Sequence, residues 1–181
     1  MNKNDLRFKK TEIAIKETYL SLKKSKKDIK IKDLCEKAMI NKTTFYAHYE
    51  TLESLKKQVC SESIKKILAN CRNVNGIFTD TNAFVNEICD IFRKNSKTIL
   101  KLYDNDINAV VNDIEKELLN NYISKDTTTD LEFAIHFCIG GAFRLLALDQ
   151  SQESINKTIY FIEKIVETLP LSFSLYRSPQ V

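Results

Sequence analysis

The sequence predicts an all-α protein, on two observations. Apolar residues recur at helical spacing along most of the 181 residues, and no segment shows the strict alternation of a β-strand. The chain contains only 3 Gly and 2 Pro, whereas average usage would give about 13 and 9 in a chain of this length. Because a β-rich fold needs many tight turns, which use both residues, we expect about nine helices joined by short polar segments.

The first two helices are expected before residue 40. The first covers about residues 9–24, with Ile15, Tyr19 and Leu22 on one face. The second is short and amphipathic, with apolar residues at positions i, i+3, i+4 and i+7: Ile31, Leu34, Cys35 and Ala38.

The next two helices begin at capping residues. Asn41 can cap a third helix by accepting a backbone N–H, and Phe45 and Tyr49 then share the inner face of that helix. Thr51 can cap a longer fourth helix, with Glu53 placed favourably in its first turn.

A weak boundary at residues 71–82 coincides with a change in charge. Residues 1–70 carry 17 Lys and Arg against 9 Asp and Glu, whereas residues 71–181 carry 11 against 15. The basic part suits a polyanionic partner, and a lysine-rich solvated face is the alternative. Beyond the boundary we expect a loosely held tail at residues 171–181 and helices over residues 82–94, 96–104, 107–123, 129–149 and 153–168.

The composition argues against a membrane or secreted protein. The longest stretch without a charged residue, residues 133–143, is eleven residues long, whereas a membrane-spanning helix needs about 20. Residues 1–10 are charged and show no secretory signal, so a cytoplasmic location is expected. The cysteines are odd in number and form no CxxC pair, which favours reduced thiols over disulfides or metal ligands: Cys35, Cys60, Cys71, Cys89 and Cys138.

The second and third helices form the arrangement that presents a helix to the DNA major groove. If Phe45 and Tyr49 point inward, the outer part of the third helix carries Lys42, Thr43, Thr44, Tyr46, Ala47 and His48. The two threonines in the first turn can reach base edges or a thymine methyl group, and Lys42 can donate to guanine or phosphate. Tyr46 and His48 have the reach for backbone phosphates.

These residues resemble the DNA-binding domain of TetR/AcrR-type transcriptional regulators. The resemblance covers about residues 8–60 and is strongest in NKTTFYAHY, residues 41–49. It implies a helix-turn-helix domain over residues 1–50, a connecting helix over residues 51–71 and a helical regulatory and dimerisation domain over residues 72–181. It further implies a homodimer that binds a palindromic operator on double-stranded DNA, usually as a repressor, and is released by a small-molecule effector.

Three positions depart from the family pattern. Lys30 stands where a capping Thr is usual, which leaves Asp28 or water to cap the second helix and frees Lys30 to reach a phosphate. Met39 stands where Gly is usual, at a cost of order 1 kcal/mol if the turn requires a positive φ. Leu52 stands where a Lys often contacts phosphate, and Lys56 or Lys57 is expected to take that role.

The resemblance also implies that the last two helices build a four-helix dimer interface. Residues 155–169 carry a heptad-like apolar stripe, and Gly140 and Gly141 lie in the middle of the preceding helix, where close helix approach explains them best. The residues expected at the interface are Gly141, Leu145, Ile155, Ile159, Ile162 and Val166.

An effector pocket would use the aromatic residues of the C-terminal part together with a lone imidazole. The candidates are Phe84, Ile88, Phe92, Tyr103, His136 and Phe137. Ordinary core packing is the alternative for the aromatic residues, and a satisfied core histidine for His136.

Two rival functions follow from the same residues. Because Lys30, Met39 and Leu52 depart from the pattern, the chain could be a helical small-molecule-binding or protein-interaction protein that no longer reads DNA. A helical enzyme would need an acid–base pair, and His136 has no obvious carboxylate partner in the sequence. Since no phosphate-binding loop, nucleophile motif or metal-ligand spacing occurs, we expect neither enzymatic activity nor a cofactor.

Overall fold

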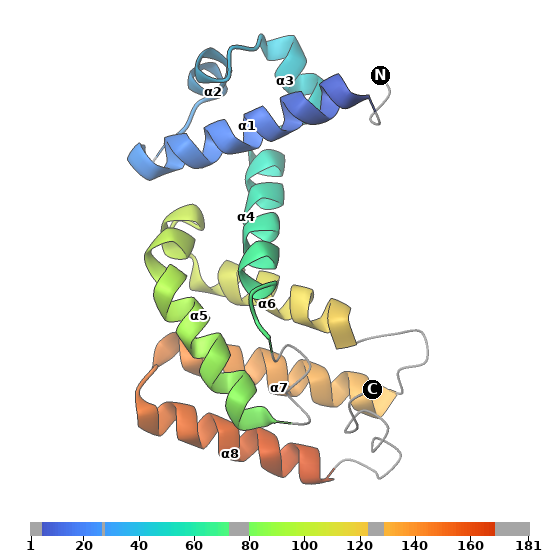
Figure 1. Cartoon of the computed structure of the whole chain (residues 1–181), viewed down its shortest axis with the longest axis vertical. Helices are drawn as coiled ribbons and strands as arrows, with labels where there is room; N and C mark the ends of the chain where they lie inside the picture. Colours follow the sequence, from blue (N-terminus) through green and yellow to red (C-terminus); the bar gives the residue numbers. More distant parts are fainter. Residues whose placement is uncertain (1–4, 27, 73–79, 123–128, 169–181) are drawn as a thin grey trace. The chain divides into compact units, whose positions relative to one another are not determined.

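The computed structural model describes residues 5–26, 28–72, 80–122 and 129–168, and within these ranges it contains helices and no strands (Figure 1). The all-α prediction is confirmed. In chain order the helices are α1 (Leu6–Ser25), α2 (Ile31–Lys37), α3 (Lys42–His48), α4 (Leu52–Leu68), α5 (Thr81–Leu102), α6 (Ile107–Tyr122), α7 (Thr129–Leu148) and α8 (Gln152–Thr168).

The described part of the chain has eight helices because two expected helices are one. The sequence predicted separate helices over residues 82–94 and 96–104, but α5 runs without interruption through residues 95 and 96. Asn95 Nδ2 donates to the carbonyl of Ile91 at 2.7 Å, and Ser96 Oγ donates to that of Arg93 at 3.1 Å. Both side chains bond back to their own helix and so do not compete with its backbone ladder. The expected tail at residues 171–181 lies outside the described residues.

The chain divides into two compact units. Unit 1 comprises Met1–Ser63 together with Leu100–Asn105, and unit 2 comprises Ile64–Ile99 and Asp106–Val181. The core of unit 1 is built by α1 to α4, whose inward side chains are fully buried: Ile15, Leu34, Phe45 and Leu55. Ile15, Leu34 and Phe45 occupy apolar positions that the sequence pattern predicted for the inner faces of their helices.

Unit 2 contains the packed helices α6, α7 and α8. Its most deeply buried side chains include Leu118, Ile139 and Ile155. On α7, Arg144 donates to Asn108 Oδ1 at 3.1 Å and Asn112 Oδ1 at 3.2 Å, which ties α7 to α6.

The two central glycines of α7 have different surroundings. A Cβ added at Gly140 would lie 3.2 Å from Glu115 Oε1 of α6, so α6 and α7 approach closely there. At Gly141 an added Cβ would meet nothing within 4 Å. Close approach within the chain therefore explains Gly140 but not Gly141.

The described cysteines are all buried and unbridged. In the described part of the chain no helix is both long and apolar enough to cross a membrane.

The turn between α2 and α3 is a helix C-cap of the type that favours glycine. The N–H of Ile40 donates to the carbonyl of Cys35 at 3.0 Å, and the N–H of Met39 to that of Glu36 at 3.3 Å. This pair of bonds defines a Schellman motif, whose central residue adopts the left-handed region. Met39 has φ 54° and is 92% exposed, so its side chain gains little packing in return for the strain.

We predict that Met39→Gly stabilises the protein by about 0.5–1 kcal/mol. The left-handed conformation costs an L-residue about 1–2 kcal/mol, and this cost is removed by glycine. Glycine also gives the unfolded chain more conformational freedom, which lowers the stability by about 0.4–1 kcal/mol. Urea unfolding measures the difference. The matched control is Ala38→Gly, because Ala38 has φ −81° and should lose stability on the same substitution. A Met39→Gly variant that is no more stable than the wild type would contradict the strain.

Candidate nucleic-acid interface

The third helix is fixed by a cap and an aromatic anchor. Asn41 Oδ1 accepts the N–H of Thr44 at 2.7 Å, which confirms the predicted cap. Phe45 is fully buried and Tyr49 is 4% exposed, with ring centroids 6.0 Å apart. The interior therefore holds one side of α3 and determines which side chains face outward.

The outer face of α3 carries the expected polar residues. Lys42, Thr43, Tyr46 and Ala47 are exposed, whereas Thr44 and His48 are half-buried. Tyr46 is 52% exposed, although its ring edge contacts Phe45. Backbone N–H groups, hydroxyls and an ammonium group thus line one accessible surface, which can donate hydrogen bonds to an anion or a base edge.

The start of α1 lies beside this surface. An open hollow of about 380 Å³ is lined by Arg7 and Thr11 of α1 together with Thr43, Thr44 and His48 of α3. The sequence pattern alone singled out neither Arg7 nor Thr11. Asp5 caps α1 by accepting the N–H of Arg7 at 2.9 Å, and this cap is the signal that would have extended the expected helix of residues 9–24 back to Arg7.

His48 is held by stacking. Its ring lies on Phe8 with centroids 3.8 Å apart and planes 25° from parallel. Within the described residues, its buried Nδ1 has no hydrogen-bond partner. Burial lowers the pKa of His48, although the Glu12 carboxylate opposes the shift. A phosphate contact by His48 at neutral pH would therefore be a hydrogen bond rather than an ion pair.

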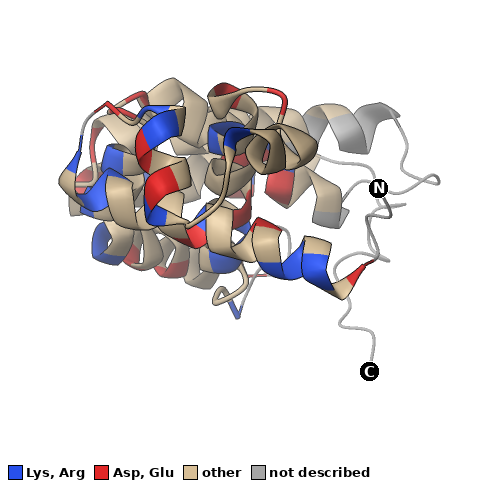
Figure 2. Cartoon of the chain, turned by 90° about the horizontal axis from the view of Figure 1, so that it is seen from above, with Lys and Arg blue, Asp and Glu red and all other residues tan. Residues whose placement is uncertain are grey.

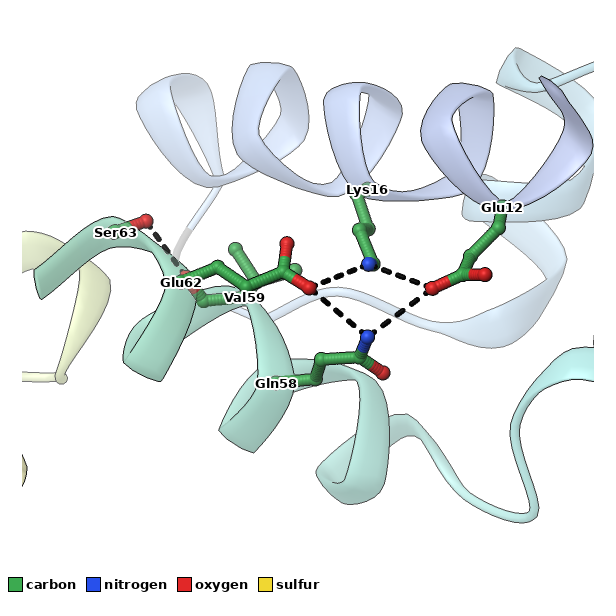
Figure 3. Close-up of polar contacts among 6 residues, drawn as sticks. All are labelled: Glu12, Lys16, Gln58, Val59, Glu62 and Ser63. Carbon is green, nitrogen blue, oxygen red and sulfur yellow. Dashed lines mark hydrogen bonds and ion pairs between the residues drawn. The ribbon is translucent and has the colours of Figure 1, made fainter. Parts of the chain in front are cut away.

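A polar brace of Glu12, Lys16, Gln58 and Glu62 joins α1 to α4 (Figure 3). Lys16 Nζ lies 2.7 Å from Glu12 Oε1 and 2.6 Å from Glu62 Oε1. Gln58 Nε2 donates to the same two oxygens at 3.1 and 3.0 Å. The hydrogen bond from Lys16 is the largest cause of the lowered pKa of Glu12. The brace spans 46 residues of sequence, so no local pattern could have predicted it.

The starts of α2 and α4 differ in their caps. Thr51 Oγ1 accepts the N–H of Ser54 at 3.0 Å and Ser54 Oγ accepts that of Thr51 at 3.2 Å, which confirms Thr51 as a cap. Lys30 makes no side-chain cap hydrogen bond at the start of α2, and it is exposed.

Lys56, which was expected to contact a phosphate, forms an ion pair within unit 1. Its Nζ lies 3.0 Å from Asp104 Oδ2, and its side chain is 27% exposed. Leu52 is half-buried at the start of α4.

Neither a protein-family model nor a curated protein sequence matches this chain. Among solved structures, the chain is similar to a TetR transcriptional regulator from Rhodococcus sp. RHA1, over 96% of this chain and 99% of that one. The TM-score is 0.54 and the sequence identity 9%. The chain has a TetR-type fold. At this identity the likeness shows the fold alone.

The expected effector residues differ in burial and in the unit to which they belong. Phe84 and Ile88 are buried in unit 2, and the ring of Phe92 lies edge-on to Phe143 with centroids 6.1 Å apart. Tyr103 is buried but belongs to unit 1, while Phe137 is 61% exposed.

His136 has a carboxylate neighbour that the sequence did not reveal. His136 Nδ1 lies 3.4 Å from Glu115 Oε1, across the contact between α7 and α6. The imidazole is exposed, in contrast to the alternative of a core histidine. In the described ranges, His, Cys, Asp and Glu form no group of three or more that could hold a metal ion.

The apolar stripe of α8 is used within the chain. Ile155, Ile159, Ile162 and Val166 are buried in unit 2, although the sequence predicted that they face a partner subunit. A heptad-like pattern shows only that a helix packs on another, and here α7 covers α8. Gly141 and Leu145 are exposed, and among the side chains that the structure describes on α7 and α8, the further large apolar ones that are exposed are Phe133, Phe137, Leu148, Tyr160 and Phe161.

We predict that the protonation of His48 makes the stability of the protein depend on pH. Because its folded pKa lies below the unfolded value of about 6.5, the unfolded chain takes up the proton first as the pH falls. Its contribution to stability is present above about pH 6.5 and is lost below. The unfolding free energy should fall more between about pH 7.5 and 5.5 in the wild type than in His48→Gln.

The matched control for this measurement is Ala47→Gln, because Ala47 is exposed on the same helix and carries no titratable group. This variant adds the same amide side chain and should keep the wild-type pH dependence. If His48→Gln follows the wild-type curve, the buried environment of His48 is contradicted.

Proposed function

We propose that the protein is a sequence-specific DNA-binding transcriptional regulator in which α3 enters the major groove. The observation that carries the proposal is the division of α3 into a buried side, with Phe45 and Tyr49, and an accessible side. In this proposal Thr43 and Thr44 contact base edges, and Lys42 contacts guanine or phosphate.

Phosphate contacts complete the proposed interface. Tyr46 and His48 reach backbone phosphates from α3, and the exposed Lys30 reaches one from the start of α2. The excess of Lys and Arg in residues 1–70 supports attraction to DNA, although both signs of charge occur along the described helices (Figure 2).

We also propose that the protein is a homodimer joined through α7 and α8. Phe133, Phe137, Gly141 and Leu145 follow one another at intervals of four residues on α7, and all four are exposed. A row of exposed apolar residues around a glycine with open space over its Cα suits a second helix from another subunit. Tyr160 and Phe161 of α8 extend the proposed interface.

In this proposal the dimer binds a palindromic operator and acts as a repressor, because its two-fold symmetry matches that of the DNA site. Two recognition helices about 34 Å apart would enter successive major grooves, so a change in their separation changes affinity. A small-molecule effector bound in unit 2, where Phe84, Phe92 and Phe143 lie, would release the DNA if it preferred another separation. A tenfold release needs only about 1.4 kcal/mol of differential binding.

The proposed DNA contact predicts a loss of affinity on substitution of α3. The full chain should enrich a palindromic sequence from a library of random duplexes. Thr44→Ala together with Tyr46→Ala should weaken binding to that sequence by about 2 kcal/mol or more, since one base contact and one phosphate contact are removed. Fluorescence anisotropy measures the affinity.

Ile13→Ala is the matched control, because Ile13 is 55% exposed on α1 and belongs to none of the proposed contacts. It should bind like the wild type. Enrichment of no sequence, with only weak and salt-sensitive binding, would favour the rival interpretation of a helical interaction protein.

The proposed interface predicts the oligomeric state. Phe137→Asp together with Leu145→Asp places two charges in the apolar row and should convert a dimer into a folded monomer. Light scattering coupled to size exclusion measures the mass. Ile13→Asp adds a charge to an exposed apolar site on α1 and should leave the dimer intact. A double variant that stays dimeric would place the interface elsewhere.

A further inference from the structure

The turn between α5 and α6 is part of unit 1, although both helices continue into unit 2. It is a second Schellman motif: the N–H of Asp104 donates to the carbonyl of Lys101 at 3.4 Å, and that of Asn105 to the carbonyl of Leu100 at 2.7 Å. Asp104 has φ 55° and Asn105 has φ 66°. Glycine is the residue that suits this conformation best, and the aspartate brings a carboxylate in its place.

That carboxylate is shared between two helices. Asp104 Oδ1 lies 2.5 Å from Lys23 Nζ of α1, and Oδ2 lies 3.0 Å from Lys56 Nζ of α4. Two further contacts fasten the same segment: Lys101 Nζ donates to the carbonyl of Lys24, and Cys60 Sγ lies 3.9 Å from the carbonyl oxygen of Leu102.

The burial of Lys23 makes the ion pair with Asp104 important. The side chain of Lys23 is only 8% exposed, and a buried ammonium group is costly without an anion beside it. Burial alone would raise the pKa of Asp104, but the hydrogen bonds from Lys23 and Lys56 outweigh it and lower the pKa. The Asp104 side chain is 41% exposed at an open hollow of about 340 Å³, so water can replace its contacts without opening a core.

We propose that Asp104 is a positioning residue for DNA binding: its carboxylate fastens the turn at residues 103–105 to α1 and α4, and release of this turn lowers DNA affinity without removing any DNA contact. The inference rests on the proposed function. In this proposal Lys56 pairs with Asp104 and does not contact a DNA phosphate.

The test compares DNA affinities of Asp104→Asn and Lys56→Gln with the wild type. The probe is the duplex enriched by the wild-type chain, and affinity is measured by anisotropy over a range of salt concentrations. Asparagine keeps the size of the side chain and tolerates the left-handed backbone. We expect each variant to bind about tenfold more weakly, within the range found for residues that act away from a ligand. The slope of log K against log salt should stay unchanged, because no phosphate contact is lost.

The sign of the effect separates this proposal from simple electrostatics. Removal of one negative charge should by itself strengthen DNA binding. If Asp104 only withholds Lys56 from a phosphate, Asp104→Asn binds more tightly, and Lys56→Gln lowers the salt slope by about 1. Either result overturns the proposal.

Asp90→Asn is the matched control. Asp90 lies on α5 and pairs with Arg93 at 3.0 Å on the surface, so its substitution removes the same charge without touching the turn. It should not weaken DNA binding.

Binding is compared at a temperature at which circular dichroism shows each variant to be folded. Folded Asp104→Asn and Lys56→Gln variants that bind like the wild type overturn the inference and leave the proposed function standing. Failure of the wild-type chain to enrich any duplex overturns both. Lys56→Gln leaves the pair between Lys23 and Asp104 in place, so it keeps the test decisive if Asp104→Asn does not fold.

Discussion

The burial of Phe45 and Tyr49 is the constraint on which the rest of the structure depends. A helix of seven residues is too short to be stable by itself, so tertiary contacts must hold α3 in place. Phe45 fills the core formed with Ile15 and Leu34, and Asn41 satisfies a backbone donor at the start of the helix. With one side fixed in this way, the outward direction of Thr43 and Tyr46 follows from the helical geometry.

Local signals in the sequence were sufficient for the first part of the fold. The caps at Asn41 and Thr51 and the anchor at Phe45 involve residues a few positions apart, so spacing and residue type predicted them correctly. The family resemblance implied that Met39 stands where Gly is usual, and the structure gives Met39 a positive φ. In each case one short segment contains all the interacting groups.

Long-range contacts could not be predicted in the same way. The brace around Lys16 and the shared carboxylate of Asp104 join residues 46 and 81 positions apart, and neither has a local pattern. Apolar periodicity predicted that one side of α8 is covered but not whether its own chain or a partner covers it, and Ile159 and Ile162, expected at a subunit interface, are buried within the chain. The break expected at Asn95 failed because a polar side chain can bond to its own helix as well as end it.

Two turns of unit 1 use non-glycine residues with positive φ, and their side chains differ in what they contribute. Met39 is exposed and adds little, whereas Asp104 places its carboxylate between two lysines. The strained backbone of Asp104 thus accompanies a specific contact between its carboxylate and the lysines of α1 and α4.

The most direct test of the central claim is photocrosslinking from the outer face of α3 to DNA. A photoreactive phenylalanine analogue placed at Tyr46 should crosslink to the enriched duplex, because that side chain is exposed on the proposed recognition surface. The same analogue at Tyr160, which is exposed on α8, should give no crosslink. Crosslinking from Tyr160 but not from Tyr46 would contradict the account.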